Sequence, residues 1–208
     1  MWVATLSLGV QDMSAEVRLL ELLFKIERCL KCYGKFRDYS DEDRVRIRVW
    51  SHEGPWFFPP LEDGGVKGFF GTGNIVFVCE RPSMRGGRVP DEWDLQFYSL
   101  LKKYGFGNAH ITDLVKCRGL ARAKEEISDY VENCLPFLKE EIEILKPKLL
   151  VAVGKVAYKV LNNRIKPQYP NLKIERITHY SYAFRYNKPA KIESDFEKLK
   201  KLWLKDDG

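Results

Sequence analysis

The stretch Glu143-Ile-Leu-Lys-Pro-Lys-Leu-Leu-Val-Ala-Val-Gly154 is the clearest guide to how this 208-residue chain folds. It starts in the last turns of a helical pattern that spans residues 124–145, and it contains a short apolar run, Leu149–Val153, of strand length. A second helical pattern, residues 155–161, follows directly. A buried strand between two helices is the repeating unit of α/β folds, so this stretch predicts that class.

The same alternation continues on both sides of this stretch. Further apolar runs lie at residues 75–78, 111–115 and 174–177, and further helical patterns at residues 94–104 and 192–204. Four short strands separated by helices predict a mainly parallel four-stranded sheet in a three-layer α/β/α sandwich. Ligands of such sheets bind beyond the carboxyl ends of the strands. The segments to inspect are therefore Cys79–Ser83, Asp113–Arg118, Gly154 and His179–Arg185.

The N-terminal part predicts one amphipathic helix. Ser14 is a typical N-cap, and the helix is expected to end near Gly34. Its apolar face is predicted to carry Val17, Leu20, Phe24 and Leu30.

Residues 38–73 are charged, then aromatic and rich in glycine and proline, so they predict a long loop or hairpin region. Within it, Trp56, Phe57 and Phe58 form either a lid or nucleic-acid surface, or packing over the sheet, and packing is the favoured interpretation. The whole chain, 1–208, is expected to be a single domain. It consists of an N-terminal helical part (1–37), this loop-rich insertion (38–73) and the α/β core (74–208).

Composition narrows the function classes. Hydrophobic residues make up 45% of the chain, which is enough for a full core. The net charge of +6 favours an anionic partner such as nucleic acid, although a basic surface alone does not establish one. No run approaches the roughly 20 apolar residues that a membrane span requires, so we expect a cytoplasmic protein without membrane contact. We also expect the protein to be a monomer.

Four of the five cysteines have the spacing of a metal site: Cys29-x2-Cys32, then Cys117 and Cys134, with Cys79 apart. Such a set suits tetrahedral zinc or a four-cysteine iron–sulfur cluster, and thiolate chemistry alone does not separate the two. Scattered buried thiols are the remaining interpretation.

Several motifs resemble, in order, the iron–sulfur (family 4) branch of the uracil-DNA glycosylases. They are Cys79-Glu-Arg-Pro-Ser83, Ile111-Thr-Asp-Leu-Val-Lys-Cys-Arg118, Asn133-Cys-Leu-Pro-Phe-Leu138, the stretch 143–154 and His179-Tyr-Ser-Tyr-Ala-Phe-Arg185. The resemblance implies the fold of that superfamily and removal of an abnormal base, uracil or another deaminated base, from DNA in base-excision repair. It further implies a 4Fe–4S cluster, in preference to zinc, on Cys29, Cys32, Cys117 and Cys134.

The resemblance also assigns roles to the motif residues. Glu80 matches the acidic residue that orients water or balances a sugar cation, and His179 matches the imidazole that donates to the departing base. DNA contacts are implied for Ser83, Lys116, Arg118, Ser181, Tyr182, Phe184 and Arg185.

The base-binding residues depart from the family pattern. Asp113 stands where the family has an asparagine that reads uracil, and an ionised carboxylate would face the O4 atom of uracil acceptor to acceptor. Asp113 then signals a changed substrate, such as cytosine, which offers an amino donor at the O4 position, or hypoxanthine, which presents another edge. Alternatively, a protonated carboxyl restores the donor to uracil if burial raises its pKa. Cys79 and Arg81 replace small residues, and Trp93 is the nearest candidate for the ring that stacks on the base.

The sequence thus predicts a monofunctional DNA N-glycosylase that forms no covalent lysine intermediate. A DNA-binding iron–sulfur or zinc protein that keeps the fold but has lost base excision is the alternative.

Overall fold

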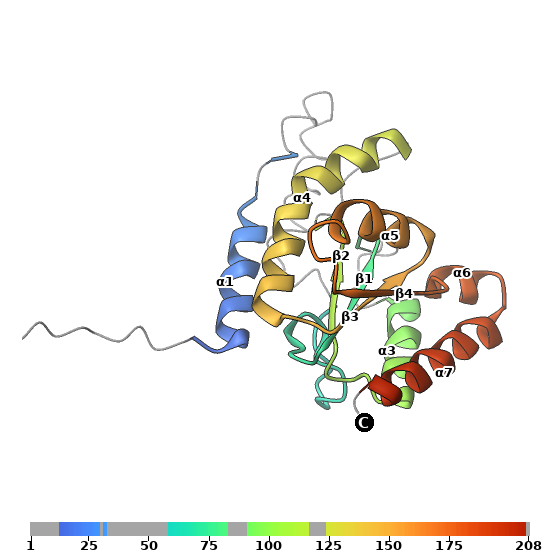
Figure 1. Cartoon of the computed structure of the whole chain (residues 1–208). Coiled ribbons are helices and arrows are strands. Elements are labelled where there is room, and N and C mark those ends of the chain that lie inside the picture. Colours follow the sequence, from blue (N-terminus) through green and yellow to red (C-terminus); the bar gives the residue numbers. More distant parts are fainter. Residues whose placement is uncertain (1–12, 30, 33–57, 83–90, 117–123, 207–208) are drawn as a thin grey trace, which may run out of the picture.

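A computed structural model describes residues 13–29, 31–32, 58–82, 91–116 and 124–206 of the chain (Figure 1). Its centre is a four-stranded sheet made of β1 (Ile75–Cys79), β2 (His110–Asp113), β3 (Leu149–Val153) and β4 (Lys173–Ile177). The strand order is β2-β1-β3-β4, and every neighbouring pair is parallel. All four carboxyl ends therefore lie at one edge of the sheet, which we call the carboxyl edge.

Helices cover both faces of this sheet, as the sequence predicts. The helices α3 (Glu92–Tyr104), α6 (Tyr180–Arg185) and α7 (Pro189–Asp206) share one core cluster with Phe77 of β1. The helices α4 (Lys124–Leu145) and α5 (Lys155–Val160) pack on the other face with Val76 and Val78. Successive side chains of a strand point to opposite faces, so the fully apolar strands serve both layers at once.

Helix α1 (Ala15–Glu27) lies outside α4 (Figure 1). Its buried residues belong to a separate core cluster that contains no residue of the sheet. The Ser14 hydroxyl accepts the Val17 N–H at its start, as expected. The predicted apolar face was wrong, because Val17, Leu20 and Phe24 are exposed and the helix ends at Glu27. The buried face is instead Leu19, Leu22, Leu23 and Ile26, which pack against Phe69, Phe137 and Ile144.

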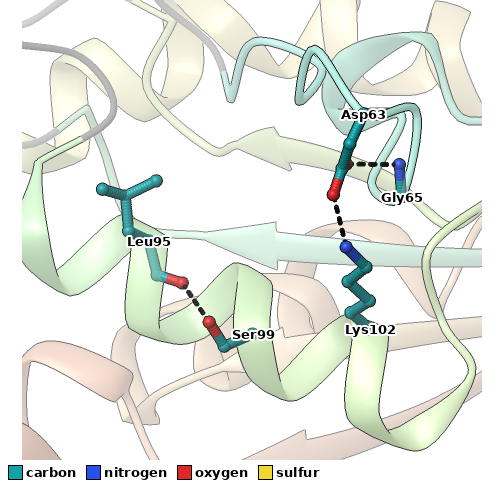
Figure 2. Close-up of polar contacts among 5 residues, drawn as sticks. All are labelled: Asp63, Gly65, Leu95, Ser99 and Lys102. Atoms are coloured by element: carbon teal, nitrogen blue, oxygen red, sulfur yellow. Dashed lines mark hydrogen bonds and ion pairs between the residues drawn. The ribbon is translucent and has the colours of Figure 1, made fainter.

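The chain that leads into β1 is fastened to α3 (Figure 2). The carboxylate of Asp63 accepts the backbone N–H of Gly65 at 2.8 Å and forms an ion pair with Lys102 of α3. Phe58 is buried, with its ring centroid 6.3 Å from that of Phe97 and a further contact to Tyr98, so its favoured packing role is confirmed. A short 3₁₀ helix, η2 (Gly68–Phe70), follows. Trp56 and Phe57 lie outside the described residues.

The remaining elements differ from the predicted patterns mainly at their ends. The second strand begins at His110 and stops at Asp113, and α7 begins at Pro189. A π-helical turn, η3 (Leu161–Ile165), extends α5. Helix α6 was not predicted, because six residues are too few for a periodic pattern. In the part of the chain that is described, no helix has the length and apolarity of a membrane span.

Candidate active site at the carboxyl edge of the sheet

The ends of β1 and β2 bring two acidic residues, Glu80 and Asp113, side by side. Cys79 and Asp113 are partners in the parallel register. Beyond them the two chains stay together, because Leu114 donates to the carbonyl of Cys79 at 2.9 Å and Val115 donates to that of Glu80 at 3.1 Å. Glu80 and Asp113, which are far apart in sequence, thus become neighbours at the carboxyl edge.

Asp113 is a buried carboxyl group that makes no hydrogen bond with the described residues. The residue is 1% exposed, and neither carboxyl oxygen has a partner there. Burial raises its pKa well above the usual value, and the negative charges of Asp94, Glu141 and Glu80 add to this, while Lys116 opposes it. This rise in pKa favours the neutral acid form of Asp113, which has one O–H donor and one carbonyl acceptor.

A buried polar network lies beside Asp113. The Lys116 ammonium is 2.6 Å from the Glu141 carboxylate and donates to the Thr112 hydroxyl at 2.6 Å. Burial acts to raise the pKa of Glu141, but Lys116 and the nearby His110 outweigh it, so this pKa is lowered. Because the Lys116 side chain is buried and paired with Glu141, its placement favours a structural role over the phosphate contact expected from the sequence.

His179 begins α6 and is held in one orientation. Its Nδ1 accepts the backbone N–H of Ser181 at 3.2 Å and lies 2.8 Å from the Ser181 hydroxyl. Burial lowers the pKa of the imidazole to about 4, so the ring is neutral at physiological pH. Since Nδ1 is an acceptor from the backbone N–H, the ring proton is on Nε2. His179 therefore offers an N–H donor that carries no positive charge.

The neighbouring strands fix the position of this histidine. Gly154, directly after β3, has a φ of +98° and donates to the carbonyl of Ile177 at 2.9 Å. A Cβ atom at Gly154 would lie 3.2 Å from the Cβ and Cδ2 atoms of His179, so only glycine allows this approach without a shift. On the other side, Asp195 of α7 accepts the backbone N–H of Thr178 at 2.8 Å.

Asp94 is a buried acid that the sequence interpretation missed. It closes a capping box with Asp91 at the start of α3, a pattern that predicts an exposed helix end. In the fold, however, the Tyr180 hydroxyl donates to Asp94 at 2.6 Å. Burial raises the pKa of Asp94 to about 6, even though this hydrogen bond lowers it. Only the packing of α6 on α3 reveals the contact, so no local sequence signal identifies it.

The first segment of the site also carries an ion pair. Arg81 Nε lies 3.7 Å from Glu80 Oε1, and both side chains are half-buried. Cys79 is buried at the strand end, and burial raises the pKa of its thiol well above the usual range. Ser83 lies outside the described residues.

The residues of α6 that follow His179 fall into two groups. Phe184 is half-buried against the core cluster that contains α3 and α7. Tyr182 and Arg185 are exposed, and the Arg185 guanidinium lies 5.2 Å from the ring centroid of Trp93. Trp93 is half-buried in the first turn of α3, next to the exposed end of α6.

Three of the four cysteines with metal-site spacing are described, and they lie close together. Cys32 and Cys134 are buried, and Cys29 is half-buried. Burial raises the pKa of Cys134 to about 11, and Cys32 and Cys29 contribute in the same direction. Cys117 and Arg118 lie outside the described residues, and no group of three potential ligands close enough for a metal ion occurs among the residues that are described.

Both buried sulfurs already accept N–H donors. The Lys116 backbone N–H donates to Cys134 Sγ at 3.3 Å, and the Asn133 amide donates to Cys32 Sγ at 3.3 Å. Hydrogen bonds of this kind stabilise metal-bound thiolates. Cys117 directly follows Lys116 in the sequence, the residue whose backbone N–H donates to Cys134 Sγ. The donor set is therefore compatible with a four-thiolate site.

Comparison with known proteins gives matches to one family. A family model described as "Uracil DNA glycosylase superfamily" matches residues 69–205, more than half of the chain. A type-4 uracil-DNA glycosylase of Pyrobaculum aerophilum is 40% identical over 55 residues, which are 26% of this chain and 28% of that protein. A second one, of Sulfurisphaera tokodaii, is 26% identical over 112 residues, 44% of this chain and 50% of that protein. The chain thus spans half or less of the length of these relatives.

Proposed function

The chain belongs to the uracil DNA glycosylase superfamily, and we propose that it hydrolyses the N-glycosidic bond of uracil in DNA. The observation that carries this proposal is the buried carboxyl group of Asp113 at the carboxyl edge, whose oxygens have no hydrogen-bond partner among the described residues and whose pKa is raised. Its O–H donates to O4 of uracil, and its carbonyl accepts from N3–H. Asp113 thus replaces the asparagine of the family without loss of the donor.

His179 supports the departing base in this proposal. As the bond between C1′ and N1 breaks, the electron pair goes to the base, and negative charge develops on its oxygen. The Nε2–H of a neutral imidazole donates to that oxygen, and the donors to Nδ1 keep the ring proton on Nε2. The base leaves as an anion and takes a proton afterwards.

Glu80 acts on the sugar side. Its carboxylate orients a water molecule, and its charge balances the oxocarbenium-like sugar. The water oxygen bonds to C1′, and its proton passes to the carboxylate. Arg81 lies 3.7 Å from Glu80 and holds this side chain at the end of β1. No covalent lysine intermediate is required. This agrees with the position of Lys116, which forms an ion pair with Glu141.

In this proposal the four cysteines Cys29, Cys32, Cys117 and Cys134 together hold a 4Fe–4S cluster. When bound, the cluster would cross-link the N-terminal segment, the segment after β2 and helix α4. In this role it stabilises the fold, since much of the binding energy of thiolates for metal is folding energy.

The cationic and aromatic residues of α6 supply DNA contacts. Arg185 provides positive charge beside Trp93, and Tyr182 projects from the exposed side of the helix. The Ser181 hydroxyl is engaged with His179, so its first role is to orient the imidazole. Ser83 and Arg118 stay predicted phosphate contacts.

The test is a panel of oligonucleotides that carry uracil, hypoxanthine, xanthine, a thymine mismatch or cytosine, each as single strand and duplex. Abasic sites are measured after alkaline cleavage under single-turnover conditions. We expect uracil to be released faster than cytosine, because O4 and N3–H of uracil match the donor and the acceptor of a neutral Asp113, whereas cytosine has an amino donor in place of O4. Binding of these oligonucleotides without any abasic product would identify a DNA-binding protein that has lost excision, and would refute the proposal.

A further inference from the structure

Two exposed tyrosines, Tyr182 in α6 and Tyr186 at its C-terminal end, form a surface that takes no part in the proposed excision chemistry. Tyr182 is 41% exposed and Tyr186 is 56% exposed, and their ring centroids lie 4.9 Å apart. The Tyr186 backbone N–H donates to the Tyr182 carbonyl at 3.2 Å, so the two rings lie one helical turn apart on one side of α6. Two exposed aromatic rings in contact form a small continuous patch, which suits a binding surface.

Two lysines place positive charge on this tyrosine pair. The Nζ atoms of Lys188 and Lys191 lie 5.7 Å and 6.0 Å from the centroid of the Tyr182 ring. The backbone N–H of Lys188 donates to the carbonyl of Ala183 at 2.7 Å, which fixes the turn that carries it. Cations beside exposed aromatic rings suit a phosphate backbone with accessible bases.

The pair is also close to the candidate active site. His179 caps the same helix, and Tyr182 and Tyr186 follow it by three and seven residues. At a rise of 1.5 Å per residue, they lie about 5 and 10 Å further along the helix axis. A stacked strand advances 3.4 Å per nucleotide, so this range is about three nucleotides long. A strand with its uracil at His179 therefore reaches both rings.

We propose that Tyr182 and Tyr186 form a stacking platform for unpaired bases of the DNA strand next to the excised nucleotide. This inference rests on the proposed function, because that function places a DNA strand at His179. In a duplex the faces of flanking bases are covered by their neighbours, so the platform favours single-stranded DNA. Stacking reads no base edge, and binding is independent of sequence.

The test measures binding of the full-length protein to a fluorescent oligothymidylate and to a duplex of equal length, neither of which contains uracil. Tyr186→Ala is expected to weaken single-strand binding about 5- to 150-fold, the range for loss of one stacked base, and to leave duplex binding within about twofold. Tyr186→Phe keeps the ring and should retain natural affinity. Phe24→Ala is the matched control, because this ring is equally exposed but lies on α1, on the far side of the sheet from α6 (Figure 1).

The lysines give an independent readout. Lys188→Ala should reduce the slope of log affinity against log salt concentration by about 0.7 on the single strand. Equal weakening of single-strand and duplex binding by Tyr186→Ala would overturn the proposal, as would unchanged binding or displacement of the oligonucleotide by polyglutamate. If the natural protein binds the single strand in this way but forms no abasic site in uracil DNA, the excision proposal fails and the platform stands.

Discussion

His179 shows how its neighbours set the orientation and the charge of a single side chain. Ser181 fixes the orientation of the imidazole, and burial lowers its pKa to about 4. The unfolded chain takes up this proton near pH 6.5, whereas the folded chain does so only near pH 4. The contribution of the neutral ring to stability is therefore complete above pH 6.5 and is lost as the pH falls from there toward 4.

Replacement of His179 by alanine should slow uracil excision about 100- to 1,000-fold in single turnovers, the usual effect of removing one donor to developing negative charge. Because the ring is already neutral, the rate of the natural protein should show no ionisation of His179 near pH 6.5. Ser181→Ala keeps the backbone donor to Nδ1 and serves as the milder comparison. A pH step near 6.5 that disappears in His179→Ala would show that the active imidazole is charged.

The residues of the site differ in how far sequence predicts them. Glu80 and His179 follow strands directly, so the position of each in the motif places it at the carboxyl edge. The state of Asp113 does not follow from its neighbours in sequence, because its pKa depends on burial and on charges from α3 and α4. The contact of Asp94 with Tyr180 depends on two helices that are far apart in the chain.

At the scale of elements, the apolar runs of β1 and β3 predict these strands well because both are buried on both faces. Helix α1 shows where such patterns fail. It carries two apolar stripes, one with Val17, Leu20 and Phe24, the other with Leu19, Leu22 and Ile26, and spacing alone does not rank them. Tertiary contact with α4 decides which stripe is buried.

Leu22→Ala should lower the free energy of unfolding by about 2–5 kcal/mol, because it leaves a cavity between α1 and α4. Leu20→Ala removes the same atoms from the exposed stripe and should change it by no more than about 0.5 kcal/mol. Denaturant titration of both variants measures the difference. Equal losses, or a larger loss for Leu20→Ala, would show that α1 packs through its other face.

At the scale of the whole molecule, the proposed four-cysteine cluster would join parts of the chain that the sheet does not hold together. Cys29 and Cys32 follow α1, Cys134 lies in α4, and Cys117 follows the segment after β2. The spacing of the cysteines predicts the set, and the packing of α1 on α4 explains how the N-terminal pair comes near Cys134.

The purified natural protein should be brown and contain about four iron atoms and four sulfide ions per chain. Cys117→Ser should lower the iron content and the melting temperature, whereas Cys79→Ser should retain the full iron content, since Cys79 is buried in the core on the opposite side of the sheet. Iron and zinc are measured by elemental analysis. A colourless protein with one zinc ion per chain would contradict the cluster, and full iron content in Cys117→Ser would exclude this residue as a ligand.

The most direct test of the account is the pH dependence of uracil excision by the natural protein and by Asp113→Asn, with the exposed Asp63→Asn as control. The raised pKa of Asp113 keeps its donor at neutral pH, and the donor is lost as the pH rises through that pKa. The natural rate should therefore fall on the alkaline side. Asp113→Asn should match the natural rate near neutral pH and exceed it above the pKa of Asp113 by about 5- to 150-fold, the value of one satisfied buried contact. Identical pH profiles, or loss of uracil excision in Asp113→Asn, would show that Asp113 does not read the base.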